Sequence, residues 1–420
     1  MKVLVVGSGG REHALAWALS RTPAVQVYAA PGNPGIARVA TCLPIAATDL
    51  PALAAAAEDL EIDLTVVGPE QPLSDGIADL FASRGLRLFG PSAAAARVEA
   101  SKAFAKDLMR RWGIPTAAYQ VCDDPDSALR AVRRAGGPVV IKADGLAAGK
   151  GVVVARTRSE AERAVEDLMV RQVHGAAGRR VVVEECLEGE EASVLALVSG
   201  AAVWPLLLAR DYKRAGSGDT GPNTGGMGAL APALLPSDAA ASALAILHRA
   251  AEALAAEGSP FVGVLYAGVM VTRDGVRVLE FNCRFGDPEA QVILPLVEGD
   301  LAEAMIAILE GGAPDLRWTP HAAVCVVAAS RGYPGPHPTG YPITGLDAVP
   351  PGTLVFHAGT ALREGRLVTA GGRVLHVVGV GATVEEARAR AYAGISAIGF
   401  EGMQYRTDIG AAAPRGATVS

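Results

Sequence analysis

The chain lacks the signals that mark several common classes of protein. Its five cysteines are odd in number, widely spaced and free of any C-x-x-C pair, which argues against a disulfide framework or a zinc knuckle and favours a reducing compartment. The formal net charge is -6 and there is no basic stripe. We therefore expect a cytoplasmic protein that has no nucleic-acid partner.

A membrane span is also lacking. The most apolar long stretch, 239–256, is alanine-rich but is interrupted by His248, Arg249 and Glu252. The short apolar run at 3–6 is followed by glycine and then charge, which predicts a first strand rather than a signal peptide. No membrane is expected as a partner.

Length and composition indicate what is present. The 420 residues are half apolar and a fifth charged, which is enough chain for two or more globular domains. The 49 glycines and 27 prolines follow no collagen-like period, so their excess should lie in loops, where phosphate sites are built. This predicts a small anionic ligand.

The first part of the chain alternates short β-branched runs with alanine-rich helical stretches, which predicts strand–helix–strand units and a parallel sheet. The expected strands are 3–6, 25–28, 64–67 and 86–89. Three of them end in glycine-rich turns, at 7–10, 68–70 and 90–92. Because ligands of such sheets bind at the carboxyl ends of the strands, these turns should share one edge.

The middle of the chain predicts a helix and a small α+β lobe. Ser101 can cap a helix that places Lys102 at its N-terminus. Strands are expected at 139–143 and 181–185, with a helix between them that starts at the capping box Ser159–Glu162. This lobe covers about 115–190.

Later segments complete a multidomain α/β and α+β fold. Strands 267–272 and 276–281 should form a hairpin that turns at Asp274-Gly275. The run 311–314 is a plausible linker to a final α+β domain, which ends in a frayed tail. The predicted domains are 1–100, 101–312 and 313–420.

Three glycine-rich loops carry candidate chemistry. The first, 7–12, resembles a dinucleotide fingerprint, but Glu12 stands where the third glycine belongs. A tight structural turn and a single phosphate held near Arg11 are equally good interpretations. The second, 144–151, has the wrong spacing for a Walker loop and lacks its Ser or Thr, so we expect a flexible tip in which Lys150 folds over a triphosphate.

The third loop, 219–228, lies past the string 211–214, in a stretch that is too polar and too rich in glycine and proline to predict a helix or strand. A structureless loop of this length is usually functional or disordered. Its mixture of Asn, Thr and cationic residues favours a binding loop over disorder.

A pair of hard oxygen ligands predicts a metal site. Glu280 and Asn282 are one residue apart on a strand, so both side chains share a face, as Mg²⁺ bridging phosphates would need. A simple ion pair between Glu280 and a lysine is the alternative. Arg284 could stabilise a transferred phosphoryl group, or it could pair with Asp287 or Glu289.

Taken together, several strings resemble the glycinamide ribonucleotide synthetase family, which are ATP-grasp ligases of purine biosynthesis. The resemblance runs from Lys2 to about Gly381. The strings are GSGGREHA (7–14), PGNPG (31–35), VVGPE (66–70), IKADGLAAGKGV (141–152), GPNTGGMGA (221–229) and EFNCRFGDPE (280–289). The last two are the most specific to this family.

The resemblance implies an ATP-grasp fold with an N-terminal parallel α/β domain and a C-terminal α+β domain. It also implies the ligation of glycine to 5-phosphoribosylamine with ATP and Mg²⁺ or Mn²⁺, through an acyl phosphate and with no covalent enzyme nucleophile. A monomer is expected.

Residue roles follow from the same resemblance. Arg284, Lys142 and Asp287 are expected to be catalytic, and Glu280 and Asn282 to bind the metal. The expected ATP contacts are Lys102, Lys142, Gly149, Lys150, Gly151, Glu184, Glu185, Leu187 and Glu191. The expected substrate contacts are Gly9, Gly10, Arg11, Asp211, Lys213, Asn223, Thr224 and Gly225.

One departure and three alternatives remain at this point. Arg210 stands where the family usually has Gln, which adds a charge near the substrate loop. A nicotinamide-dependent oxidoreductase would leave the lysines and the E-x-N pattern without a role. Another ATP-grasp ligase or bicarbonate-using carboxylase would share these residues but not N-T-G-G-M-G or R-F-G-D-P-E, and a non-catalytic nucleotide-binding module would not need them all.

Overall fold

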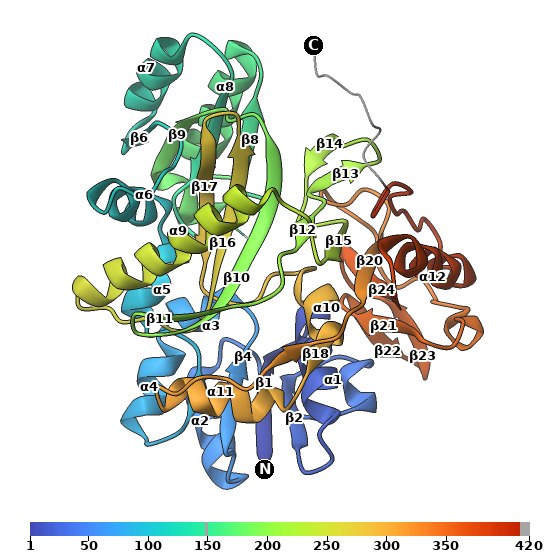
Figure 1. Ribbon diagram of the computed structural model, residues 1–420. Helices are drawn as coiled ribbons and strands as arrows, with labels where there is room; N and C mark the ends of the chain where they lie inside the picture. The colour runs from blue at the N-terminus through green and yellow to red at the C-terminus, as the bar shows by residue number, and fades with distance from the viewer. Residues whose placement is uncertain (148–149, 412–420) are drawn as a thin grey trace.

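A computed structural model describes residues 1–147 and 150–411. Figure 1 shows three regions that meet at the centre of the molecule: an N-terminal sheet with its helices, a tall central region of two sheets, and a C-terminal sheet covered by a helix. The C-terminal sheet stands beside both other regions, so segments far apart in sequence come together where the three meet.

The N-terminal region is a parallel sheet of order β3-β2-β1-β4-β5, as predicted. Because helices cover both faces, β1 reads as a continuous apolar run whose Val3–Val6 are wholly buried. Its strands are β1 (Lys2–Gly7), β2 (Gln26–Pro31), β3 (Thr41–Cys42), β4 (Leu64–Val67) and β5 (Leu88–Phe89). Its helices are α1 (Gly10–Ser20), α2 (Leu50–Asp59), α3 (Glu70–Ser74), α4 (Ile77–Ser83) and α5 (Ala93–Ala100).

The first central sheet is antiparallel, of order β11-β10-β16-β17. It contains the predicted hairpin, formed by β16 (Val262–Thr272) and β17 (Gly275–Asn282), beside β10 (Glu190–Ser199) and β11 (Ala202–Pro205). Among the described residues, α9 (Ser237–Ala256) is the one helix long and apolar enough to cross a membrane, a test that core helices also pass. Its Leu247 and Leu254 belong to the core formed with this sheet, which accounts for its apolar character.

The second central sheet belongs to the small lobe and is also antiparallel, of order β6-β9-β7-β8. Its elements are β6 (Tyr119–Cys122), α7 (Pro125–Ala135), β7 (Val139–Ala143), β8 (Val152–Ala155), α8 (Arg158–Val165) and β9 (Val181–Glu185). The prediction that a helix starts at Ser159 was wrong, because Thr157 is the N-cap and forms the capping box with Glu160. α6 (Lys102–Arg111) leads into the lobe and is capped by Ser101, as predicted.

The C-terminal sheet has the order β12-β15-β20-β24-β21 and carries α12 (Val384–Ala397), capped by Thr383. Its strands are β12 (Arg210–Asp211), β15 (Gly228–Ala231), β20 (Ala322–Ala329), β21 (Thr353–His357) and β24 (Arg373–Gly381). The remaining elements are β18 (Val297–Glu298), β19 (Arg317–Trp318), β22 (Thr360–Arg363), β23 (Arg366–Thr369), α10 (Ala290–Ile293) and α11 (Leu301–Leu309).

The expectation that 211–228 forms no strand was wrong. Besides β12 and β15, the segment forms a hairpin of its own from β13 (Arg214–Gly216) and β14 (Thr220–Asn223). Its residues are exposed or half-buried, so no apolar pattern in the sequence marks these strands.

Three buried histidines join the N-terminal and C-terminal regions. His13 of α1 accepts a hydrogen bond at Nδ1 from the backbone N–H of His357, at 2.7 Å, and packs edge-on against Phe356. His376 is wholly buried beside Gly10. Burial lowers the pKa of His13 to about 3 and that of His357 and His376 to about 4 each, so the three side chains are neutral in the fold.

This cluster predicts a loss of stability in mild acid. When the pH falls below the ordinary histidine pKa of 6.5, each of these histidines takes up a proton in the unfolded chain but not in the folded protein. Each should therefore cost up to about 1.4 kcal/mol of stability per pH unit. As the pH is lowered from 7.5 to 5.0, the midpoint temperature of thermal unfolding should decrease. The decrease should be smaller in His13→Asn, because asparagine does not titrate. Equal losses in the two proteins would contradict this account.

Candidate functional site

A cavity of about 510 Å³ lies where the three regions meet. Most residues predicted from the sequence to bind or react are brought together on its wall. They are Arg11, Lys102, Lys142, Gly151, Glu184, Glu185, Leu187, Glu191, Asp211, Lys213, Asn223, Thr224, Gly225, Glu280, Asn282, Arg284 and Asp287. Gly9, Gly10 and Lys150 are not part of the lining, and Gly149 lies outside the described residues.

One end of the cavity is built around a buried carboxylate. Glu184 of β9 lies 2.7 Å from the Nζ of Lys106 and 3.0 Å from that of Lys142, and Lys106 and Glu184 are each only 2% exposed. Burial, together with the charge of Lys142, lowers the pKa of Lys106 to about 8, although Glu184 opposes this. Lys142 also donates to the carbonyl of Leu279 on β17, at 2.8 Å. The small lobe and the central hairpin are thus joined at this point.

The chain leaving β9 forms the wall next to this carboxylate. Glu185, Cys186 and Leu187 line the cavity in sequence, and apolar side chains including Val154 and Met270 complete the wall. The Oε1 of Glu185 accepts a hydrogen bond from the N–H of Ala118, at 2.9 Å, which fixes the strand end. An apolar slot of this kind at a strand end suits a planar heterocycle.

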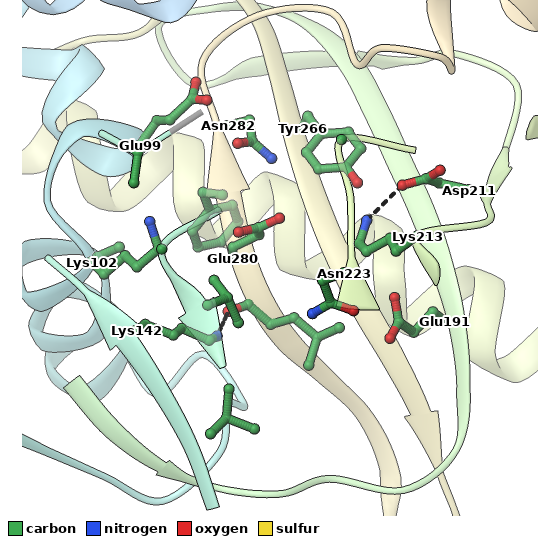
Figure 2. A pocket seen from close by; sticks show the side chains of 18 of the residues that line it. Glu99, Lys102, Lys142, Glu191, Asp211, Lys213, Asn223, Tyr266, Glu280 and Asn282 are labelled. Atoms are coloured by element: carbon green, nitrogen blue, oxygen red, sulfur yellow. Dashed lines mark hydrogen bonds and ion pairs between the residues drawn. The ribbon is translucent and has the colours of Figure 1, made fainter. Parts of the chain in front are cut away.

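The predicted metal ligands face the middle of the cavity. Figure 2 shows the side chain of Glu280 in the space between Lys102, Lys142 and Lys213, with Asn282 above it between Glu99 and Tyr266. Within the described chain no cation lies within ion-pairing distance of Glu280, so the alternative of a simple Glu280–lysine pair was wrong. Burial would raise the pKa of Glu280, but Lys213 and the other surrounding cations outweigh it and lower the pKa.

These two residues suit a divalent cation that is shared with a ligand. A carboxylate and an amide oxygen are hard donors of the kind that Mg²⁺ binds, but two are too few for its octahedron. The described residues contain no cluster of three or more His, Cys, Asp or Glu side chains that could hold a metal by themselves. The donor set therefore fits a metal that completes its shell with phosphate oxygens and water.

Arg284 is held by carboxylates of the N-terminal region. Its guanidinium lies 2.8 Å from Glu99 of α5 and 3.2 Å from Glu70 of α3. The expectation that its pairing partner would be Asp287 or Glu289 was therefore wrong. Glu99 also accepts a hydrogen bond from the backbone N–H of Cys283, at 2.7 Å, and Cys283 is buried just after the end of β17.

Asp287 is held instead by the C-terminal region. Arg373 of β24 lies 2.9 Å from its carboxylate and also donates to its backbone carbonyl, at 2.7 Å. The same guanidinium donates to the carbonyl of Gly225 in the substrate loop, and Gln291 donates to the carboxylate at 2.7 Å. Burial would raise the pKa of Asp287, but the charges of Arg373 and Arg11 outweigh it and hold the pKa well below its usual range.

The space around the glycine-rich turn after β1 is filled by the side chain of Glu12. The Oε2 of Glu12 accepts a hydrogen bond from the N–H of Gly9, and its Oε1 lies 2.6 Å from Arg11. A Cβ at Gly68 would collide with the same carboxylate, so Glu12 occupies the space between the ends of β1 and β4. Arg11 still reaches the cavity wall.

The unusual Arg210 has a local partner. Its guanidinium lies 2.9 Å from Glu190 and stacks over Tyr212. Farther into the cavity, Lys213 lies 2.9 Å from Asp211, as Figure 2 shows. The additional charge of Arg210 is thus neutralised outside the cavity, since Arg210 is not part of the lining.

Several functional residues escaped the sequence analysis. Lys106, Glu70, Glu99 and Arg373 all line the cavity, and each is bound to a residue that was predicted. Only Glu70 and Lys106 lie in or next to recognisable strings, VVGPE and the helix after Ser101. Glu99 and Arg373 stand in no motif, so only the packing of the three regions reveals them.

Comparison with known proteins agrees with this geometry. Family profiles described as phosphoribosylglycinamide synthetase match the chain in three parts: the N domain at residues 1–99, the ATP-grasp (A) domain at 100–290 and the C domain at 323–412. The phosphoribosylamine–glycine ligase of Halalkalibacterium halodurans is 50% identical, over 98% of this chain and 97% of its own. The trifunctional purine biosynthetic protein adenosine-3 of Gallus gallus is 49% identical over 97% of this chain and 42% of its own.

Solved structures show the same relationship. The crystal structure of phosphoribosylamine–glycine ligase from Thermotoga maritima has a TM-score of 0.85 and 36% identity, and the match covers 97% of this chain and 100% of that one. The biotin carboxylase domain of Hydrogenobacter thermophilus 2-oxoglutarate carboxylase has a TM-score of 0.76 at 18% identity, covering 96% and 91% of the two chains, and shows the fold alone.

The fold and the cavity define an ATP-grasp enzyme of the ligase class. Within that class, the chain belongs to the phosphoribosylglycinamide synthetase family, whose relatives are named phosphoribosylamine–glycine ligase.

The ion pairs of Glu184 with Lys106 and Lys142 predict that the stability of the protein depends strongly on this one carboxylate. Glu184→Gln leaves Lys106 and Lys142 close together, buried and without a negative charge, which should cost about 3–5 kcal/mol in denaturant unfolding at pH 7. The loss should shrink at pH 9, because burial lowers the pKa of Lys106 to about 8 and this lysine can then be neutral in the fold. An unfolding midpoint equal to that of the unmodified protein at both pH values would contradict this role of Glu184.

Proposed function

We propose that the protein joins the carboxyl group of glycine to the amine of 5-phosphoribosylamine, with conversion of ATP to ADP and phosphate, in the cytoplasm. The observation that carries this proposal is the ring of cations around the Glu280–Asn282 pair, next to an apolar slot, within a chain of this family. A triphosphate, a metal and a carboxylate to be activated are the ligands that such a ring can neutralise together.

The first step transfers the terminal phosphoryl group of ATP to the glycine carboxylate. The slot at Glu185–Leu187 takes the adenine, Glu191 the ribose, and Lys102 and Lys142 the phosphates. Arg284 faces the oxygens on which charge develops during transfer. The protein contributes alignment and charge neutralisation, so no nucleophilic side chain is needed.

The second step is attack by the amine of phosphoribosylamine on the resulting glycyl phosphate. The carbon–nitrogen bond forms, phosphate leaves, and the nitrogen loses a proton. Arg11, Asp211, Lys213 and Asn223–Gly225, which line the same cavity, take this substrate, and Asp287 lines the cavity with them. Because water would hydrolyse the acyl phosphate, the small lobe acts as a lid.

A divalent metal, Mg²⁺ or Mn²⁺, would be held by Glu280 and Asn282. It would supply charge neutralisation between the transferring phosphate oxygens. The low pKa of Glu280 and the absence of a cation at pairing distance in the described structure leave its carboxylate ionised and available for this purpose.

The reaction is tested by adding Mg-ATP and freshly prepared phosphoribosylamine, with and without glycine. ADP release should require both glycine and phosphoribosylamine. Release that is independent of glycine, or that responds to bicarbonate instead, would refute the assignment and favour a carboxylase such as those that share the fold.

The metal assignment is tested with Glu280→Gln, which keeps the shape of the side chain but removes its charge. Turnover should fall by roughly 100-fold or more, while the affinity for ATP measured without metal should change little. Glu303→Gln, which alters an exposed carboxylate on α11, is the matched control. Unchanged turnover in Glu280→Gln would remove Glu280 from the metal site.

A further inference from the structure

The β13–β14 hairpin forms part of the substrate wall but has no core of its own. Its base lies at the cavity, where Thr224 donates to the carbonyl of Lys213 from both its N–H and its hydroxyl, each at 2.8 Å. From there the two strands run outward with exposed or half-buried residues. An isolated two-stranded hairpin is at best marginally stable in water, so something else must fix its position.

The tip of the hairpin is held by a short segment near the C-terminal end of the described chain. We call this segment, Arg406, Thr407 and Asp408, the C-terminal latch. The N–H of Gly218 donates to Asp408, at 2.8 Å, and the N–H of Thr407 donates to the hydroxyl of Ser217, at 3.1 Å. These contacts join residues almost 190 positions apart.

Arg406 is the centre of the latch. Its guanidinium lies 2.7 Å from Asp219 at the hairpin tip, donates to the carbonyl of Arg214 at 3.1 Å, and lies 2.6 Å from Asp408. It also stacks over Tyr212, the residue before Lys213. Although it carries a full charge, its side chain is only 1% exposed, and a buried arginine is tolerated only when its donors are paired in this way.

The C-terminal latch lies outside the cavity, so its residues do not contact a ligand there directly. Arg406, Thr407 and Asp408 are not part of the cavity lining, whereas Lys213, Arg214 and Asn223 at the base of the hairpin are. Holding the tip and the strand at Arg214 leaves the base little freedom to tilt. An effect of Arg406 on a ligand in the cavity must therefore pass through the hairpin.

We propose that Arg406 is a positioning residue that fixes the β13–β14 hairpin from outside the active site and thereby sets the affinity for the amine substrate. The inference rests on the proposed function, because the hairpin base is assigned there to phosphoribosylamine. In the described structure, the latch forms no hydrogen bond or ion pair with the adenine slot at Glu185–Leu187, so we expect the binding of ATP to depend on it far less than binding of the amine substrate does.

Two variants test the proposal in the full-length protein. Arg406→Gln removes the charge and most of the donors. Asp219→Asn removes only the negative charge of the partner at the hairpin tip, and because Asp219 has a positive φ of 53°, a conformation that asparagine tolerates well, the turn itself is preserved. In both variants the KM for phosphoribosylamine should rise roughly tenfold to a hundredfold, with the larger rise in Arg406→Gln, while the KM for ATP stays within about twofold.

Hydrogen exchange of the backbone amides at 214–223 provides a readout that needs no activity. These amides should exchange faster in both variants, whereas those of β16 and β17 should not change. Arg390→Gln is the matched control, because Arg390 donates to the carbonyl of Val380 within the C-terminal region and does not contact the hairpin.

Three outcomes would overturn the positioning role: unchanged exchange at 214–223, a parallel rise in the KM for ATP, or the same effects in Arg390→Gln. If the unmodified protein releases no ADP in response to phosphoribosylamine, the proposed function fails instead. In that case the exchange comparison still decides whether Arg406 holds the hairpin.

Discussion

The rest of the structure depends on one constraint, which is that positive charge must be concentrated in the central cavity. The chain carries a net charge of -6, yet its ligands are anions, so the positive charge must be concentrated in one place. The cavity does this with cations that carboxylates hold in place, some of them from distant parts of the chain: Glu184 holds Lys142, and Glu99 holds Arg284. Without these pairs, the folded state would be destabilised by repulsion between the cations and by the free-energy cost of burying their charges.

The same pairs hold the three regions together. Arg284 stands at the end of the central hairpin but is bound by two helices of the N-terminal region, and Asp287 three residues later is bound by β24 of the C-terminal region. The segment from 280 to 289 is therefore where all three regions are joined. Residues that hold the fold and residues that face the ligands cannot be separated here, because the same ion pairs serve both purposes.

How much could be read from the sequence depended on whether the signal was local. The parallel sheet, the β16–β17 hairpin and the strands 139–143 and 181–185 follow from apolar runs and turn residues, and these were predicted correctly. The spacing of Glu280 and Asn282 was enough to place both on one face. The β13–β14 hairpin was missed because its strands are stabilised by Arg406, almost 190 residues away, and not by an apolar pattern. The partners of Arg284 were missed because Glu70 and Glu99 meet it only through the packing of separate regions.

The C-terminal latch also has a consequence for the order in which the protein is made. A chain emerging from the ribosome would complete its N-terminal sheet, the apolar slot at Glu185–Leu187 and the Glu280–Asn282 pair by residue 282, well before Arg373 and Arg406 have been synthesised. At that stage Asp287 and the substrate hairpin would still lack the side chains that hold them. An unfinished chain would thus have what it needs to bind a nucleotide before it has an ordered acceptor side. Assembly of the acceptor side waits for almost the last residues of the described chain, which makes it a late event in synthesis.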